Sequence, residues 1–216
     1  MKRREFSATA GVLGASALML PGMGFAQAKA PQEGKDFRLL DKKVPSDAPP
    51  GKIEVIEFFW YSCPHCNAFE PKLNAWLKKL PPDVSFRRVP VAFRDDFVPQ
   101  QRLYYTLEGL GKVDELHDKV FDAIHKQHLP TDREDRILDF AERNGLDRAK
   151  FQAMYNSFGV ATKARKAKQL QDDYQVDGVP ALGVAGRYYT DGTMAGSMER
   201  ALMVVDYLIA QARTRK

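Results

Sequence analysis

The stretch IEVIEFFWYSCPHC occupies residues 53–66 and decides the fold. Its first part, 53–60, is almost continuously apolar and rich in β-branched and aromatic side chains, which predicts a strand buried on both faces. After this stretch, apolar residues recur every three or four positions, which predicts a helix as far as Leu80, where two prolines follow. Cys63 and Cys66 are therefore expected where a buried strand meets the N-terminus of a helix.

A block of helices is expected over 97–175. Its apolar residues follow helical spacing in four segments, which are 99–109, 113–127, 132–144 and 147–174. Thr131, followed by Glu134 three positions later, has the pattern of a capping box at the start of the third helix. The basic stretch 163–168 is interpreted as the solvated face of the last helix.

Strands flank this block. Residues 84–91 predict a strand before it, 179–184 and 187–189 predict a hairpin after it, and 197–213 predict a final amphipathic helix. The expected fold class is therefore α/β. We expect a lead-in of little packing content at 29–49, a first α/β part at 50–96, the helical insertion at 97–175 and a second α/β part at 176–216.

The composition is that of an ordinary soluble globular protein. Of the 216 residues, 44% are hydrophobic and 28% are charged, which argues against a disordered or membrane-embedded chain. The formal net charge is +5, and residues 2–5 contribute +2 of it. The remaining excess of about +3, without a basic cluster interleaved with aromatic side chains, argues against nucleic acid as a partner.

Residues 1–28 have the three parts of a secretory signal peptide. A basic start, a weakly apolar run at 7–20 and the small-residue site Ala26-Gln27-Ala28 follow in that order, so we expect cleavage after Ala28. A membrane anchor is the alternative, but the apolar run is shorter than the ~20 residues that a span needs. The start also resembles a twin-arginine signal, which leaves the export route open. The mature chain is expected in the periplasm.

Cys63 and Cys66 are the two cysteines of the chain. In an exported protein such a pair can be a reactive disulfide, half of a metal site or a structural staple. A zinc site needs two further ligands, and the closely spaced histidines that the chain offers are His125 and His128. A staple across so short a loop restrains the unfolded chain little. The spacing therefore favours a reactive pair without a metal.

The expected helix N-terminus gives a chemical reason for reactivity at Cys63. Unpaired amides and the positive end of the helix dipole stabilise a thiolate there, and a protonated or hydrogen-bond-donating His65 adds to this effect. Cys66 lies one turn into the helix and is expected to be the less exposed, resolving cysteine. Glu57 is either a buried proton relay for Cys66 or a solvated carboxylate at a sheet edge.

Three features together resemble the DsbA family of exported thiol:disulfide oxidoreductases, a branch of the thioredoxin superfamily. They are the segment 58–66 with its CPHC motif, the helical block that follows it, and the sequence Gly-Val-Pro-Ala at 178–181. The resemblance extends over residues 50–213. It implies a thioredoxin-like fold with an inserted helical domain.

The resemblance also implies roles for individual residues. The implied redox centre consists of Cys63, Pro64, His65 and Cys66 and uses no external cofactor. Val179 and Pro180 are implied to be joined by a cis peptide bond that faces the cysteines. The backbone of Val179 is then placed to pair with an extended substrate as an added strand.

The implied partners are unfolded or reduced exported proteins, which receive the disulfide, and a DsbB-like, quinone-linked membrane protein, which restores it. Some relatives carry a second, structural pair of cysteines that this chain lacks.

Other functions stay open at this point. A thiol reductase or disulfide isomerase would use the same centre, although the CPHC motif favours oxidation. The lack of an obvious dimerisation segment argues against an isomerase and fits a monomer. A metal-binding chaperone would use both cysteines with a histidine. A helical module that binds client proteins would make the cysteines incidental.

Overall fold

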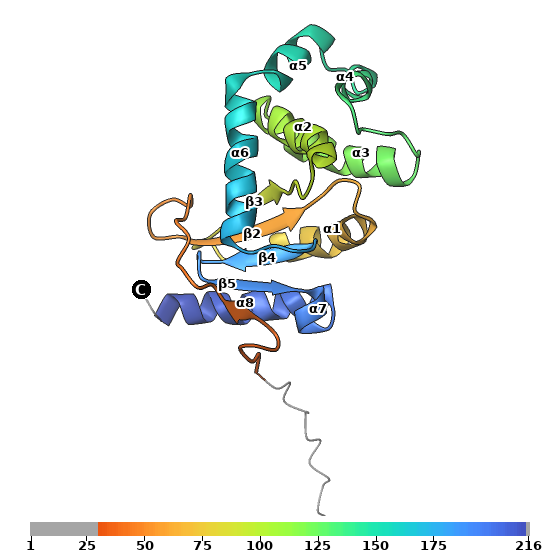
Figure 1. Cartoon of the computed structure of the whole chain (residues 1–216). Coiled ribbons are helices and arrows are strands. Elements are labelled where there is room, and N and C mark those ends of the chain that lie inside the picture. Colours follow the sequence, from red (N-terminus) through yellow and green to blue (C-terminus); the bar gives the residue numbers. More distant parts are fainter. Residues whose placement is uncertain (1–29, 215–216) are drawn as a thin grey trace, which may run out of the picture. The chain divides into compact units, whose positions relative to one another are not determined.

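A five-stranded mixed sheet lies at the centre of the computed structural model, which describes residues 30–214 (Figure 1). The strands are β1 (Arg38–Leu39), β2 (Ile53–Phe59), β3 (Val84–Pro90), β4 (Ala181–Val184) and β5 (Tyr188–Asp191). Their order is β1-β5-β4-β2-β3, in which β2 and β3 are parallel and the other neighbours antiparallel. All seven residues of β2 are buried, which confirms the predicted buried strand. The expected signal peptide at 1–28 lies outside the described residues.

Helices account for most of the remaining described chain. They are α1 (Pro64–Leu77), the short 3-10 helix η1 (Asp95–Phe97), α2 (Val98–Gly109), α3 (Val113–His125), α4 (Glu134–Arg143), α5 (Arg148–Tyr155), α6 (Phe158–Asp173), α7 (Gly192–Ala195) and α8 (Met198–Thr214). Helices α2 to α6 stand between β3 and β4, where the sequence predicts a helical insertion. Within residues 30–214, no helix has the length and apolar character needed to cross a membrane.

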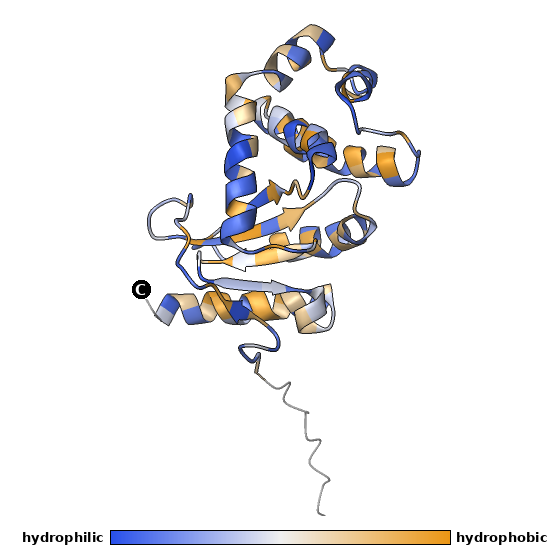
Figure 2. Ribbon diagram, in the orientation of Figure 1, coloured by the Kyte–Doolittle hydropathy of each residue, from blue (hydrophilic) through white to orange (hydrophobic). Residues whose placement is uncertain are grey.

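Each face of the sheet has its own hydrophobic core. Ile53 and Val55 of β2 pack with residues of α1 and α8 on one face, and Ile56 and Phe58 pack with residues of α6 on the other. This division follows from the two-residue period of a strand. Figure 2 shows β2 and α8 mostly in orange, whereas α6 is largely blue. The charged side chains of 163–168 lie exposed on α6, as predicted.

The single helix predicted over 147–174 is wrong, because the structure has two helices there. Helix α5 ends at Tyr155, and Ser157 begins α6 with an extended backbone and a side chain that accepts a hydrogen bond from the Val160 N–H. The apolar spacing continues across this break and therefore does not reveal it. The signal that marks it is the serine, a preferred N-cap residue.

The lead-in at 29–49 packs more than the sequence predicts. Phe37 and Val44 are buried, and β1 adds an antiparallel edge to the sheet at β5. The Val44 N–H donates a hydrogen bond to the Gly186 carbonyl at 2.8 Å. A side chain at Gly186 would collide with the Val44 carbonyl, so the hairpin turn needs glycine at this close approach. Few residues of the segment are apolar, which is why its composition suggested little packing.

The capping box predicted at Thr131 and Glu134 is also wrong. Arg133 is the N-cap residue of α4 and makes no hydrogen bond to the helix through its side chain. Thr131 is buried, and its Oγ1 accepts a hydrogen bond at 2.9 Å from Gln100 Nε2. A tertiary contact thus takes the hydroxyl that the local pattern assigned to a cap. Helix α1 likewise ends before the predicted Leu80.

Candidate active site

Cys63 is the N-cap residue of α1. Its backbone is extended, with φ of −80° and ψ of 117°, and Pro64 follows in the first turn, where a helix tolerates a missing N–H group. The Cys66 N–H donates a hydrogen bond to Cys63 Sγ at 3.4 Å. The predicted junction between strand and helix is therefore confirmed, and the free amides of α1 point at the Cys63 sulfur.

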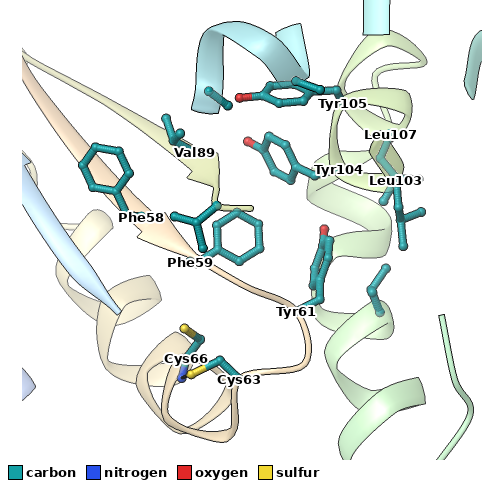
Figure 3. Close-up of a cluster of buried hydrophobic side chains, with 14 of the residues drawn as sticks. Phe58, Phe59, Tyr61, Cys63, Cys66, Val89, Leu103, Tyr104, Tyr105 and Leu107 are labelled. Carbon is teal, nitrogen blue, oxygen red and sulfur yellow. Dashed lines mark hydrogen bonds between the residues drawn. The ribbon is translucent and has the colours of Figure 1, made fainter. Parts of the chain in front are cut away.

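The two cysteines are free and buried to different degrees. Cys66 is fully enclosed, whereas Cys63 retains 7% of its surface. Figure 3 shows the two sulfur atoms next to each other at the border of the aromatic cluster that contains Phe59 and Tyr61. A reactant from solvent can therefore approach Cys63 but not Cys66.

The pKa values of the two thiols are also shifted in opposite directions. Hydrogen bonding from the Cys66 side chain is the main cause that lowers the pKa of Cys63 from 9.0 to about 6, and the N–H groups of Cys66 and His65 and the charge of His65 contribute in the same direction. Burial raises the pKa of Cys66 well above its ordinary value. Near pH 7 the pair thus holds a thiolate at Cys63 and a thiol at Cys66.

The loop before β4 lies against this pair. The bond between Val179 and Pro180 is cis, which confirms that expectation. The Val179 carbonyl oxygen lies 3.4 Å from Cys63 Sγ, across 116 positions of sequence, and can accept a hydrogen bond from the protonated thiol. Pro180 is buried and Val179 half-buried, while His65 and Pro64 are exposed beside Cys63. The structure thus brings together all of these predicted site residues.

Glu57 is fully buried, so its interpretation as a solvated edge carboxylate is wrong. It is also not a lone carboxylate, because Arg88 Nε donates a hydrogen bond to Glu57 Oε2 at 3.0 Å. Burial, followed by the negative charge of Glu70, raises the pKa of Glu57 well above its ordinary value. Glu57 interacts electrostatically with both Cys63 and Cys66. A buried carboxyl group of raised pKa therefore interacts with both members of the cysteine pair.

A buried polar network continues from Glu57 into the helical insertion. Arg88 Nη2 donates a hydrogen bond to Glu70 Oε2 at 2.8 Å, and Glu70 Oε1 lies 3.0 Å from His117 Nε2. His117 Nδ1 in turn lies 2.9 Å from the Tyr61 hydroxyl, which points away from the cysteines in Figure 3. The network joins β2, β3, α1 and α3 beneath the active-site loop.

Sequence reasoning missed the partners of Glu57. One signal was available for Glu70, which follows Cys66 by four positions and therefore lies on the same buried face of α1. No comparable signal marks Arg88 or His117, because both meet the site only through tertiary contacts.

The helical insertion also holds the active-site loop. Gln100 of α2 accepts a hydrogen bond from the Ser62 N–H at 3.2 Å and donates one to Ser62 Oγ at 2.6 Å. His125 Nε2 of α3 lies 2.8 Å from the Tyr61 carbonyl. His125 thus holds the backbone of the loop by a hydrogen bond. Within residues 30–214, no three His, Cys, Asp or Glu side chains are grouped as metal ligands.

Comparisons with known proteins agree with this geometry. Residues 54–203 match the family described as the DSBA-like thioredoxin domain. The thiol:disulfide interchange protein DsbA of Burkholderia cepacia is 42% identical over 195 residues, which cover 90% of this chain and 92% of that protein. The protein of the same name from Azotobacter vinelandii is 45% identical over 181 residues, covering 84% of each chain.

A solved structure of a protein with the same name is also similar to this chain. The crystal structure of Pseudomonas aeruginosa DsbA aligns with a TM-score of 0.80 at 43% sequence identity, covering 84% of this chain and 94% of that one. This likeness confirms the predicted thioredoxin-like fold with an inserted helical domain. The chain therefore belongs to the DsbA family of thiol:disulfide oxidoreductases, whose members use a redox-active cysteine pair, and it is an enzyme that catalyses disulfide formation.

Proposed function

We propose that this enzyme donates a disulfide between Cys63 and Cys66 to newly exported proteins in the periplasm, after removal of residues 1–28. The observation that carries the proposal is the contrast between the two thiols. Stabilisation of the Cys63 thiolate favours the reduced form of the pair, and this makes the disulfide form a strong oxidant. The enclosed Cys66 leaves Cys63 as the sulfur that a substrate attacks.

The proposed reaction transfers two electrons from substrate to enzyme. A substrate thiolate attacks Cys63 Sγ, the bond between the two enzyme sulfurs breaks, and a mixed disulfide forms while Cys66 leaves as a thiolate. A second substrate thiolate then attacks the substrate sulfur of the mixed disulfide. The products are a substrate disulfide and the Cys63 thiolate. The Cys66 thiolate needs a proton, because burial raises its pKa.

Glu57 is the proposed source of that proton. Burial raises the pKa of Glu57 and so favours its protonated form, and the carboxyl group interacts electrostatically with Cys66. When the pair is oxidised again, the same carboxylate would accept the proton of Cys66 so that Cys66 can attack as a thiolate.

The proposed substrate surface surrounds Cys63. An extended substrate would pair with the Val179 backbone, next to the buried Pro180, and would lie beside the exposed His65. Half-buried Trp60, stacked on Phe97 with ring centroids 3.9 Å apart, adds an apolar contact that needs no particular substrate sequence. Re-oxidation by a DsbB-like, quinone-linked membrane protein and action as a monomer complete the proposal.

Equilibration with glutathione tests the proposed direction of the reaction. We expect the reduced pair to be strongly favoured at neutral pH. Because the lowered pKa of Cys63 favours the reduced form only where its thiolate exists, this preference should weaken as pH falls through about 6. A reduction potential near about −270 mV, the thioredoxin value, would instead indicate a reductase.

Replacing His65 by alanine is expected to raise the pKa of Cys63 above about 6, because the charge of the imidazole is lost while the backbone N–H groups stay. The pH dependence of Cys63 alkylation measures this change directly. The exposed His128 lies at a φ of 55°, which asparagine tolerates, so His128→Asn is a matched control. An alkylation midpoint that does not move in His65→Ala would rule out the side chain's role.

Replacing Glu57 by glutamine is expected to slow thiol exchange by roughly ten- to hundredfold and to flatten its pH profile, since Cys66 loses its proton relay. Glutamine keeps an oxygen for the Arg88 hydrogen bond. Glu54, buried on the same strand and bonded to Arg87, serves as the control through Glu54→Gln. Rates that superimpose on those of the parent at every pH would exclude the relay.

A further inference from the structure

The buried network beneath the cysteines holds one cation and two carboxyl groups. Arg88 contacts Glu57 at 3.0 Å and Glu70 at 2.8 Å. Burial opposes the charge of Arg88, but the two carboxyl groups outweigh it and raise its pKa, so Arg88 stays cationic. Burying an unbalanced charge is costly, and one carboxylate is enough to neutralise one guanidinium. The two carboxyl groups therefore share one proton.

The number of donors at each carboxyl group decides where that proton resides. Glu70 receives hydrogen bonds from two groups, Arg88 Nη2 and His117 Nε2. Glu57 receives one, from Arg88 Nε, and its Oε1 is buried without a hydrogen-bond partner among the described residues. Hydrogen bonds to a carboxylate favour its charged form. The negative charge thus belongs on Glu70, and the proton belongs on Glu57.

Without His117 each of the two carboxyl groups would keep a single hydrogen bond from Arg88, so the difference in hydrogen bonding between them would be lost. The imidazole is oriented for this task by the Tyr61 hydroxyl. A neutral ring protonated at Nε2 donates to Glu70 and accepts from Tyr61 at Nδ1, so all three partners are satisfied at 2.9 and 3.0 Å.

The surroundings of His117 favour this neutral form. Charged and titratable groups of several elements act on the ring. They are Glu70 of α1, Arg88 of β3, Asp118 of α3, Tyr61 of the loop and Tyr104 of α2. Burial is the largest effect and, together with the Arg88 charge, outweighs the two acids and lowers the pKa of His117.

We propose that His117 is a positioning residue that, by donating a hydrogen bond to Glu70, places the shared proton of the buried carboxyl pair on Glu57. The proposal rests on the function proposed above and assigns the residue that keeps Glu57 protonated. If the charge moved to Glu57, it would repel the thiolate of Cys63 and the thiol pair would become a weaker oxidant, since Glu57 and Cys63 interact electrostatically.

A double-mutant cycle tests this assignment with four proteins, which are the parent, His117→Phe, Glu57→Gln and the double variant. Phenylalanine removes the donor but keeps an aromatic ring against Phe59 and Phe121. The ultraviolet absorbance of the thiolate gives the pKa of Cys63 in each protein. We expect His117→Phe to raise it by about 0.5 to 1, a three- to tenfold loss of thiolate stabilisation, and to have no effect when position 57 is glutamine.

Three further outcomes separate the possibilities. An equal change in both backgrounds, or no change in His117→Phe, overturns the role of His117. Slow exchange in Glu57→Gln beside an inert His117→Phe leaves the relay standing and removes only its positioning residue. His117→Gln retains a side-chain N–H donor and should therefore keep the pKa of Cys63 at the value of the parent protein. A raised pKa of Cys63 in His117→Gln would also contradict the assignment.

The tautomer of His117 provides a test that needs no variant. Nitrogen NMR of the histidine-labelled protein should show Nε2 protonated and Nδ1 unprotonated, with no titration near neutral pH. A ring protonated at both nitrogens near pH 7, or at Nδ1 alone, would overturn the proposal.

Discussion

Replacing Cys63 by serine is expected to abolish disulfide transfer to a reduced dithiol peptide. The remaining cysteine cannot replace it, because Cys66 is fully buried and its raised pKa keeps it a thiol. The helix amides that stabilise a thiolate at Cys63 would instead face a hydroxyl group that does not ionise. Oxidation of the peptide, followed by mass spectrometry, measures the loss.

Cys66→Ser is the matched control. It keeps the reactive sulfur as a thiolate, so we expect Cys63 to attack an oxidised, disulfide-bonded peptide and to release one peptide thiolate. The mixed disulfide should then accumulate, because the resolving thiol is missing. Residual transfer by Cys63→Ser, or equal inactivity of both variants toward capture, would contradict the assigned order of attack.

Replacing Arg88 by methionine is expected to give the largest loss of stability, about 3–5 kcal/mol, because it leaves a buried carboxylate without its cation. The Arg88 side chain is only 12% exposed, and it bridges Glu57 and Glu70. Chemical denaturation of the reduced protein gives the free energy of unfolding. The loss should shrink as pH falls, since protonation of the orphaned carboxylate removes the buried charge.

Arg213→Met is the control for the loss of a single ion pair. Arg213 pairs with Asp83 on the surface, where the two side chains are 41% and 39% exposed, and solvent screens such a pair. We expect little change in stability. An Arg88→Met protein as stable as Arg213→Met would mean that the buried carboxyl groups are neutral and that the network carries no charge.

Local sequence patterns were sufficient to predict the part of the site that contains the two cysteines. The apolar run of β2, the helical spacing of α1 and the placement of Cys63 between them follow from hydrophobic period and turn chemistry, and the structure confirms all three. The cis bond before Pro180 came from the family resemblance, since most bonds before proline are trans.

The buried network could not be predicted in this way. Arg88 lies 31 positions from Glu57, and His117 lies 47 positions from Glu70, so no periodic pattern relates these residues. Arg88 lies in the strand predicted at 84–91, and nothing in that pattern marks it as a partner of Glu57. The same limit explains Thr131, whose hydroxyl has a tertiary partner instead of a helix cap.

The hydrogen bonds that hold the active-site loop set the order in which the enzyme matures. Ser62 is anchored by a residue 38 positions later, the Tyr61 carbonyl by one 64 positions later, and Cys63 meets Val179 only after 116. The chain is synthesised from the N-terminus to the C-terminus, so both cysteines are made long before the residues that complete their environment. Until the last strands join the sheet, the loop with the cis bond that faces Cys63 is missing, so the complete surroundings of the cysteine pair form late in the folding of the protein.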